Sequence, residues 1–505
     1  MLKIGRHLVH VLLAAGAALS ALSVPQAMAA PRADRFGRLF PELPAFAKAT
    51  PKVQAALLKI GEKGGILDAK DELEAGPVAL IVDPNLNLNN LNADLPIGTA
   101  GTTFMGQFMD HDMTFDTTSP LGVSTRPERS PNARKPALDL DAVYGKGPTA
   151  TPQFYDPDDR VKFKVERGGL FEDLPRSVGG AAIIADPRND ENLIIAGLHA
   201  AFLLFHNRAV DEVREAGVSD PREVFAEARR LLTWHYQWIA LHEILPSFIG
   251  QTLVNEILRN GRRFYHPRSQ KAAFIPVEFQ AAAYRFAHSI VRPSYRANFT
   301  GDPDGQFGGQ FFGMIFDPAG QGQADPIDLR GGTRAPRRFI GWPTFFDFGD
   351  GTLRPRKRID TRISTPLLNL PLGAIPSGMP PLSLPQRNLL RHLTWDLPSG
   401  QSIANRMGVT ALSASDFAEL AGFGLGLESN TPLWYYVLKE AELMEGGQIL
   451  GPVGGRIVGE VIIGLLQTDR NSFLSVQPDW RPTLGGAGEF RMVDFLNFAG
   501  VGGTR

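Results

Sequence analysis

The side chains best suited to acid–base chemistry gather between positions 106 and 115. His111 stands between Asp110 and Asp112, and Gln107 precedes it by four positions. An imidazole can accept and return a proton because its unperturbed pKa lies near neutrality. A lone histidine is more often a core residue held by local hydrogen bonds, so the surrounding sequence must decide between the two roles.

The same stretch has the spacing of a short helix with one apolar face. Thr102-Thr103 is a suitable N-cap, so we predict that the helix begins there. Gln107 falls one turn before His111 on the same face. Side chains at i, i+4, i+7 and i+11 share that face: Phe104, Phe108, His111 and Phe115. The predicted helix therefore sets an imidazole and an amide among aromatic rings, where polar groups need partners.

A second histidine lies beside arginines in a segment rich in alanine and phenylalanine. We predict a helix over residues 277–291, ending before Pro293. Arg285, His288 and Arg292 share one face of it at i, i+3 and i+7.

An arginine and a glutamate precede another predicted helix, which spans residues 193–216. Arg188 and Glu191 are three positions apart, the spacing of a weak first-turn salt bridge. His199 and His206 lie seven apart on one face of the helix, but no carboxylate clearly completes a metal site. We therefore interpret both histidines as structural.

Two aspartates alternate with leucines in residues 138–145. Asp139 and Asp141 are compatible with a half-exposed strand or a solvated loop. A calcium site is the alternative, since Ca²⁺ binds six to eight oxygens from carboxylates and carbonyls. The residues alone leave both interpretations open.

The composition of the 505-residue chain is that of a large globular protein. It is 43% hydrophobic and 21% charged, with a formal net charge of −1. This balance gives no electrostatic argument for a nucleic-acid partner. The absence of cysteine excludes disulfides, thiolate ligation of haem and cysteine-held iron–sulfur clusters.

The first residues have the pattern of an export signal. Lys3 and Arg6 precede the apolar run 11–22, and Ala27-Met28-Ala29 offers small residues for cleavage. We predict a signal peptide over residues 1–29, a secreted or periplasmic protein, and no transmembrane segment. Export without cysteine suits a bacterial source. We further predict an N-terminal arm over residues 30–95 that packs on a main domain of residues 96–505.

Residues 107–112, Gln-Phe-Met-Asp-His-Asp, resemble the distal-histidine signature of the animal-type haem peroxidases, the peroxidase–cyclooxygenase superfamily. Residues 138–145, 185–192, 284–289 and 387–391 resemble further segments of that family in the same order. The resemblance spans roughly residues 100–470. It implies a mainly α-helical fold with few short strands, built as one large domain around haem b.

The resemblance also implies roles for individual residues. His111 would be the distal acid–base group, assisted by Gln107 and the catalytic Arg188, and His288 would be the iron ligand. Residues that would hold the haem are Arg285 at a propionate, Asn388 as the acceptor for His288, Arg391 in the same Asn-x-x-Arg motif, and the ester-forming Asp110 and Glu191. Asn192 follows Glu191 where some mammalian members have a methionine, so a sulfonium link is not expected.

The family's calcium loop implies Asp112, Asp139 and Asp141 as metal ligands. The loop usually opens with a threonine, and this chain has Lys135 at that position. A cation beside a Ca²⁺ site is unfavourable unless its side chain turns away.

The function implied is oxidation of small phenolic or halide donors by hydrogen peroxide. One alternative is a fatty-acid dioxygenase of the same superfamily, and another is a non-catalytic exported haem or matrix-binding protein. In the superfamily's oxygenases a catalytic tyrosine precedes the proximal histidine by three residues, but here that residue is Arg285. Tyr284 is rotated by about 100° around the predicted helix, so we expect it to face away from the haem. This favours the peroxidase.

Overall fold

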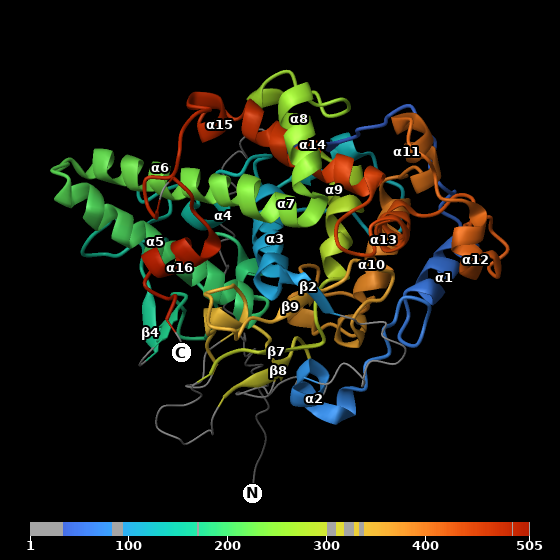
Figure 1. Cartoon of the computed structure of the whole chain (residues 1–505), viewed down its shortest axis with the longest axis horizontal. Helices are drawn as coiled ribbons and strands as arrows, with labels where there is room; N and C mark the ends of the chain where they lie inside the picture. Colours follow the sequence, from blue (N-terminus) through green and yellow to red (C-terminus); the bar gives the residue numbers. More distant parts are fainter. Residues whose placement is uncertain are drawn as a thin grey trace, which may run out of the picture. The chain divides into compact units, whose positions relative to one another are not determined.

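The computed structural model describes residues 34–82, 94–168, 171–299, 310–317, 328–332, 338–486 and 488–503. The signal peptide predicted for residues 1–29 lies outside this part of the chain. The described residues are mainly α-helical with a few short strands, which confirms the predicted fold class (Figure 1).

The helices and strands follow one another along a single compact unit, Asp34–Arg505. The α-helices are α1 Pro51–Ile60, α2 Gly76–Val82, α3 Ala100–Met113, α4 Asp141–Tyr144, α5 Leu193–Glu215, α6 Pro221–Ile239, α7 Leu245–Ile249, α8 Gln251–Asn260, α9 Val277–Gln280, α10 Leu384–Thr394, α11 Gly400–Met407, α12 Ala418–Ala421, α13 Leu433–Met444, α14 Pro452–Thr468, α15 Phe473–Val476 and α16 Met492–Phe498. The strands are β1 Asp34–Gly37, β2 Asp94–Thr99, β3 Pro131–Asn132, β4 Glu166–Gly168, β5 Phe171–Asp173, β6 Ile275–Pro276, β7 Ser294–Arg296, β8 Phe312–Met314 and β9 Pro355–Lys357.

The described strands form small sheets of two or three strands that connect segments of the chain, and they do not form a core sheet. β1 pairs antiparallel with β3 and parallel with β6. β2, which leads directly into α3, pairs antiparallel with β9. The pairs β4–β5 and β7–β8 are antiparallel as well. Helices therefore supply the core, and the β2–β9 pair anchors the start of α3.

Helix α5 is the central buried helix of the described chain. It lies beside α6 in Figure 1 and also contacts α3. By length and composition alone it could cross a membrane, but 83% of its most apolar window is buried inside the protein. A helix that is apolar on all sides is expected in the core of a large protein. A π-helical segment, Ala240–Ile244, joins α6 to α7.

Helix α3 begins earlier than predicted and presents a different face to its surroundings. Its N-cap is Thr99, whose side chain accepts a hydrogen bond from the Thr102 backbone N–H, so Thr102 and Thr103 lie inside the helix. Phe108 packs flat against Phe202 of α5 with ring centroids 4.2 Å apart. Phe115 lies beyond the end of the helix at Met113. The predicted stripe is thus divided between the core and the cavity described below.

The helix predicted over residues 277–291 is wrong as a single element. The chain forms α9, turns at Ala281–Ala282 and continues as a 3-10 helix, η9, over Ala283–His288. Ala282 has φ −133° and ψ −76°, outside the helical region, which breaks the run. In a 3-10 helix, residues at i and i+3 lie above one another, so Arg285 and His288 still share a side.

Residues 34–82 of the predicted arm pack against the rest of the unit through several contacts. α1 lies against α10. Asp68 accepts a hydrogen bond from the Thr365 hydroxyl, and Asp71 accepts one from the Thr365 backbone N–H. The side chain of Glu278 accepts hydrogen bonds from the backbone N–H groups of Leu39 and Phe40. A boundary at residue 95 stays a prediction.

Candidate functional site

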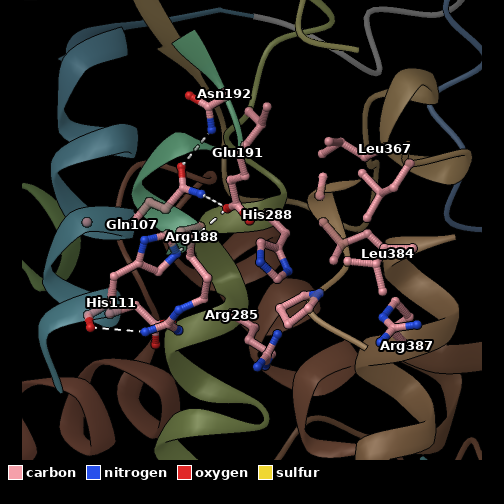
Figure 2. Close-up of a pocket in the computed structure, with 18 of the residues that line it drawn as sticks. Gln107, His111, Arg188, Glu191, Asn192, Arg285, His288, Leu367, Leu384 and Arg387 are labelled. Carbon is pink, nitrogen blue, oxygen red and sulfur yellow. Dashed lines mark hydrogen bonds and ion pairs between the residues drawn. The ribbon is translucent and has the colours of Figure 1, made fainter. Parts of the chain in front are cut away.

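One cavity of about 210 Å³ brings together most of the residues singled out from the sequence. Figure 2 shows Gln107 and His111 on one side of it, Leu367, Leu384 and Arg387 on the other, and His288 with Arg285 between them. Other predicted site residues that line the cavity are Asp110, Arg188, Glu191 and Arg391. Asn388 does not line the cavity but contacts the Nδ1 of His288. The three aspartates of the calcium prediction lie outside the cavity.

His111 is buried, and a hydrogen bond from a neighbouring segment fixes its ring. The His111 Nδ1 lies 2.8 Å from the Asn189 Oδ1. The Asn189 Nδ2 in turn lies 2.9 Å from the Nδ1 of His199 on α5. With the amide oriented in this way, the His111 Nδ1–H donates and its Nε2 is left as the basic nitrogen. All three side chains are almost fully buried.

Asn189 and His199 are site residues that sequence reasoning did not find. Nothing in their types distinguishes them, because an asparagine in a turn and a histidine on a core helix are ordinary features. The only available signal was the position of Asn189 directly after Arg188. Their roles depend on a contact between three separate segments, which local spacing cannot reveal.

The electrostatic surroundings keep His111 neutral over the physiological pH range. Burial lowers its pKa to about 4, and the positive charge of Arg188 acts in the same direction. Asp186 and Asp110 oppose this shift but do not cancel it. A neutral imidazole with a free Nε2 is a proton acceptor at pH 7.

Arg188 is buried in a cluster that fixes its guanidinium. Its Nε and Nη2 bond to the carboxylate of Asp186 at 3.0 and 2.7 Å, and Nη2 also donates to the His111 carbonyl at 3.0 Å. The guanidinium lies over the Phe115 ring, 4.1 Å from its centroid. Burial alone would lower the pKa of Arg188, but Asp186 raises it above its ordinary value. The sequence spacing suggested a salt bridge between Arg188 and Glu191. This is wrong, because the guanidinium of Arg188 pairs with the carboxylate of Asp186 instead.

Glu191 faces Gln107 across the cavity. The side-chain nitrogen of Gln107 donates a hydrogen bond to the Glu191 carboxyl. The side-chain oxygen of Gln107 accepts a hydrogen bond of 3.2 Å from Asn192. The Glu191 Oε1 is 3.7 Å from the His111 Nε2. Burial raises the pKa of Glu191 to about 8, although Arg188 opposes the shift, so this carboxyl is mainly protonated at pH 7.

On the other side of the cavity, His288 contacts Asn388 of α10. The Asn388 Nδ2 is 2.7 Å from the His288 Nδ1, and the Asn388 Oδ1 accepts a hydrogen bond of 3.3 Å from Arg285. The contact predicted from sequence is present, but the amide oxygen faces Arg285 instead of the imidazole. Burial lowers the pKa of His288 to about 3, and Arg285 adds to the effect. The ring is therefore neutral and can bind a metal.

The same side of the cavity holds a guanidinium that is hydrogen-bonded but has no carboxylate partner. Among the described residues, no carboxylate forms a salt bridge with the partly buried Arg285, whose Nε donates to the Gln280 carbonyl at 2.7 Å. Burial and the nearby Arg391 lower the pKa of Arg285 to about 9. Arg391 itself pairs with Asp116 at 2.8 Å. The buried Gln280 Oε1, in the same cavity wall, has no hydrogen-bond partner.

Tyr284 lines the cavity, so the expectation that it faces away is wrong. Its ring stacks on Phe279, with ring centroids 4.7 Å apart. The Tyr284 hydroxyl donates to the Gly106 carbonyl of α3 at 3.1 Å. Burial raises the pKa of Tyr284 well above its ordinary value.

The three aspartates of the predicted calcium site form a cluster outside the cavity. One carboxylate oxygen from each of Asp112, Asp139 and Asp141 lies within 4.8 Å of the others. Lys135 does not turn away from them, since its Nζ is 2.8 Å from the Asp139 Oδ2. The strand alternative for residues 138–145 is wrong, because Asp141–Tyr144 form the short helix α4.

Comparison with known proteins gives a family match over part of the chain. The family model described as animal haem peroxidase matches residues 120–308, a region that contains Arg188, Glu191 and His288. The peroxidasin homolog pxn-2 of Caenorhabditis elegans is 31% identical over 110 residues, 22% of this chain and 8% of that protein. The dual oxidase of Drosophila melanogaster is 28% identical over 112 residues, 22% of this chain and 7% of that protein. The match spans less than a tenth of either relative.

Solved structures resemble the chain over most of its length. Peroxidase A from Dictyostelium discoideum has a TM-score of 0.57 at 16% identity, covering 87% of this chain and 88% of that one. The fatty acid alpha-dioxygenase of Oryza sativa has a TM-score of 0.52 at 14% identity, covering 82% and 74%. At these identities the likeness concerns the fold, which is that of the helical haem peroxidases. Together with the family match, it supports the peroxidase–cyclooxygenase superfamily and an oxidoreductase of peroxidase type.

The hydrogen bond between His111 and Asn189 predicts how the imidazole titrates. In Asn189→Asp a carboxylate would face the Nδ1, so the pKa of His111 should rise from about 4 towards its ordinary value. Side-chain NMR of ¹³C,¹⁵N-histidine-labelled protein would follow the titration. Asn207→Asp, a change of the same kind at a partly buried site elsewhere, is the control. An unchanged His111 titration in Asn189→Asp would show that the two residues are not in contact.

Proposed function

We propose that this chain is a haem-dependent peroxidase that uses hydrogen peroxide to oxidise small phenolic or halide donors. The observation that carries the proposal is a pair of neutral imidazoles in one cavity, the buried His111 on α3 and the partly buried His288 on η9. The Nε2 of His111 is a basic nitrogen free for proton transfer. The Nδ1 of His288 contacts the side-chain amide of Asn388. The family match and the fold of the structural neighbours support the same conclusion.

The residues around the cavity fit a haem. His288 would hold the iron, and Arg285, a partly buried guanidinium that has no carboxylate partner among the described residues, would pair with a propionate. Arg391 is a second cationic side chain that lines the cavity on the side of Arg285. A haem bound here would supply the redox chemistry, and the protein would supply binding, orientation and proton transfer. Apolar side chains suited to the porphyrin faces and edges complete the wall: Val291, Ile315, Phe316, Leu367, Leu370, Ala374, Ile375 and Leu384.

An anion at Arg285 would also affect His288. Asn388 turns its oxygen towards Arg285, which leaves its amide nitrogen on the imidazole. Once a propionate satisfies the guanidinium, the Asn388 amide is free to turn, and its oxygen can then accept the His288 Nδ1–H. That hydrogen bond fixes the tautomer whose Nε2 binds a metal. The pairing of Arg285 would thus favour ligation by His288.

In the proposed reaction His111 moves the proton. Its Nε2 takes a proton from hydrogen peroxide and returns it to the departing oxygen, while Asn189 keeps the Nδ1 protonated. Arg188 stabilises negative charge that develops on the oxygens, although Asp186 already engages its Nε and Nη2. Gln107 orients the distal water and holds Glu191 through the amide nitrogen.

We place this activity outside the cytoplasm, because of the export signal predicted for residues 1–29. The donors that we propose are small molecules. Haem b fits the absence of cysteine ligands.

Two substitutions should separate haem binding from proton transfer. His288→Ala should abolish the Soret band of a ligated haem. His111→Ala should retain that band but lose peroxide turnover by about 10²–10⁴-fold, the usual contribution of an acid–base group. His266→Ala, at a histidine outside the cavity, is the control. Rapid-mixing absorption spectroscopy with hydrogen peroxide measures both effects. An unchanged spectrum in His288→Ala would remove the proposed ligand, and near-normal peroxide reaction in His111→Ala would remove the proposed base.

Asp110 and Glu191 line the cavity and are the proposed ester-forming residues. After exposure to hydrogen peroxide, haem should resist acid–acetone extraction from the wild-type protein. The double variant Asp110→Asn, Glu191→Gln should release it. Mass spectrometry of tryptic peptides would locate the bond on either carboxylate. Complete extraction of haem from wild-type protein after turnover would contradict covalent attachment.

A fatty-acid dioxygenase is the second candidate, and one observation favours it. Tyr284 lines the cavity, and the chain shares its fold with fatty acid alpha-dioxygenases. The tyrosine is nevertheless one position from the residue that the superfamily's oxygenases use, and its hydroxyl is bonded to the Gly106 carbonyl. We therefore expect no oxygen uptake with linoleate or palmitate in an oxygen-electrode assay. Sustained uptake that Tyr284→Phe abolishes, with peroxide oxidation of phenols unaffected, would establish the dioxygenase.

A further inference from the structure

Asp112, Asp139 and Asp141 form a cluster beside α3, and their carboxylates already contact cations and hydrogen-bond donors of the protein itself. Asp112 is the residue after His111, and it is fully buried at the end of α3. Its carboxylate lies 3.0 Å from the Leu140 backbone N–H nitrogen and 3.5 Å from that of Ala142. The Tyr236 hydroxyl donates to it as well, at 3.3 Å. Both carboxylate oxygens of Asp112 are therefore occupied by protein donors.

The other two carboxylates face positively charged side chains. The Lys135 ammonium is 2.8 Å from the Asp139 Oδ2, and the Lys135 backbone N–H donates to the Asp141 Oδ2 at 3.3 Å. The Arg134 Nε is 3.9 Å from the Asp141 Oδ1, a buried oxygen that has no hydrogen bond, but it donates to Asp186 at 2.8 Å. The guanidinium of Arg229 donates to the backbone carbonyl of Asp139 at 3.2 Å. Of these three cations, Lys135 is the one whose side chain directly contacts a carboxylate of the cluster.

This arrangement does not fit Ca²⁺. The ion requires six to eight oxygens at about 2.3–2.6 Å, so an ion on the Asp139 Oδ2 would lie within a few ångströms of the Lys135 ammonium. It would also compete with the backbone donors on Asp112 and with Arg229 at the Asp139 carbonyl. Repulsion between like charges at such separations is large where one partner is desolvated.

From these contacts we infer that Lys135, with the positive charges of Arg134 and Arg229 nearby, takes the place of a divalent cation, so that residues 134–141 and α3 are held together without calcium. The Lys135 side chain is 56% exposed, and an isolated surface pair of this kind would be weak. Here the ammonium belongs to a network of several charges, which is where such pairs matter. The consequence is that the position of His111 does not depend on free calcium.

The inference predicts that chelation has no effect on the wild-type protein. After dialysis against EGTA, mass-spectrometric metal analysis should find only substoichiometric calcium. The Tm should stay the same in EGTA and in millimolar CaCl₂. Neither readout depends on activity, so this test is separate from that of the proposed peroxidase reaction.

Lys135→Thr restores the threonine expected of the family's calcium loop and removes the ammonium. This variant should bind one equivalent of Ca²⁺, and excess CaCl₂ should raise its Tm by roughly 3–5 °C if free calcium exceeds Kd about 100-fold. Lys146→Thr removes the same charge from an exposed lysine just beyond the cluster and should gain no calcium response. Isothermal titration calorimetry with CaCl₂ measures the binding directly.

Two results would overturn the inference. One is a tightly bound calcium ion in the wild-type protein whose removal lowers the Tm. The other is a folded Lys135→Thr variant that still binds no Ca²⁺, because the ammonium would then not be what excludes the ion. If Lys135→Thr does not fold, Lys135→Met and the wild-type metal content decide the question in the same way.

Discussion

The side-chain amide of Asn189 holds the distal side of the cavity together. It bonds to His111 of α3 on one side and to His199 of α5 on the other, and it lies in the turn that carries Arg188. Three segments distant in sequence therefore meet at one buried group. A buried amide left without these partners would cost about 1–3 kcal/mol for each unsatisfied donor or acceptor. The tautomer of His111 depends on this contact, which also joins the Asn189 turn to α3 and α5.

The two sides of the cavity differ in how their charges are balanced. On the distal side Asp186 neutralises Arg188, and burial keeps the Glu191 carboxyl mainly protonated. On the His288 side Arg285 is partly buried and has no carboxylate partner among the described residues. A ligand that brings its own anionic groups is thus stabilised at one edge only. This asymmetry orients a flat molecule whose carboxylates are all on one edge.

The sequence was sufficient for the fold class and for gathering most of the cavity residues. His111, Arg188 and His288 could be selected because their segments follow a known order and each occurs in a locally readable pattern. The sequence could not predict that the Phe108 ring packs against α5, because an apolar ring can be buried equally well against a helix or against a cofactor. The break at Ala282 escaped prediction because alanine is a strong helix former, and tertiary contacts overrode its propensity. Asn189 and the orientation of Asn388 depend on distant partners, which no local pattern encodes.

The hydrogen bond from Tyr284 to the Gly106 carbonyl links the two walls that carry the histidines. A Cβ at Gly106 would lie 3.0 Å from Phe248 but 3.7 Å from the Tyr284 hydroxyl, so a side chain here would press on Phe248 and not on the phenol. The Tyr284 hydrogen bond ties η9 to α3 beside the cavity. The segments that carry His288 and His111 are therefore held to each other by the protein alone, before any ligand enters.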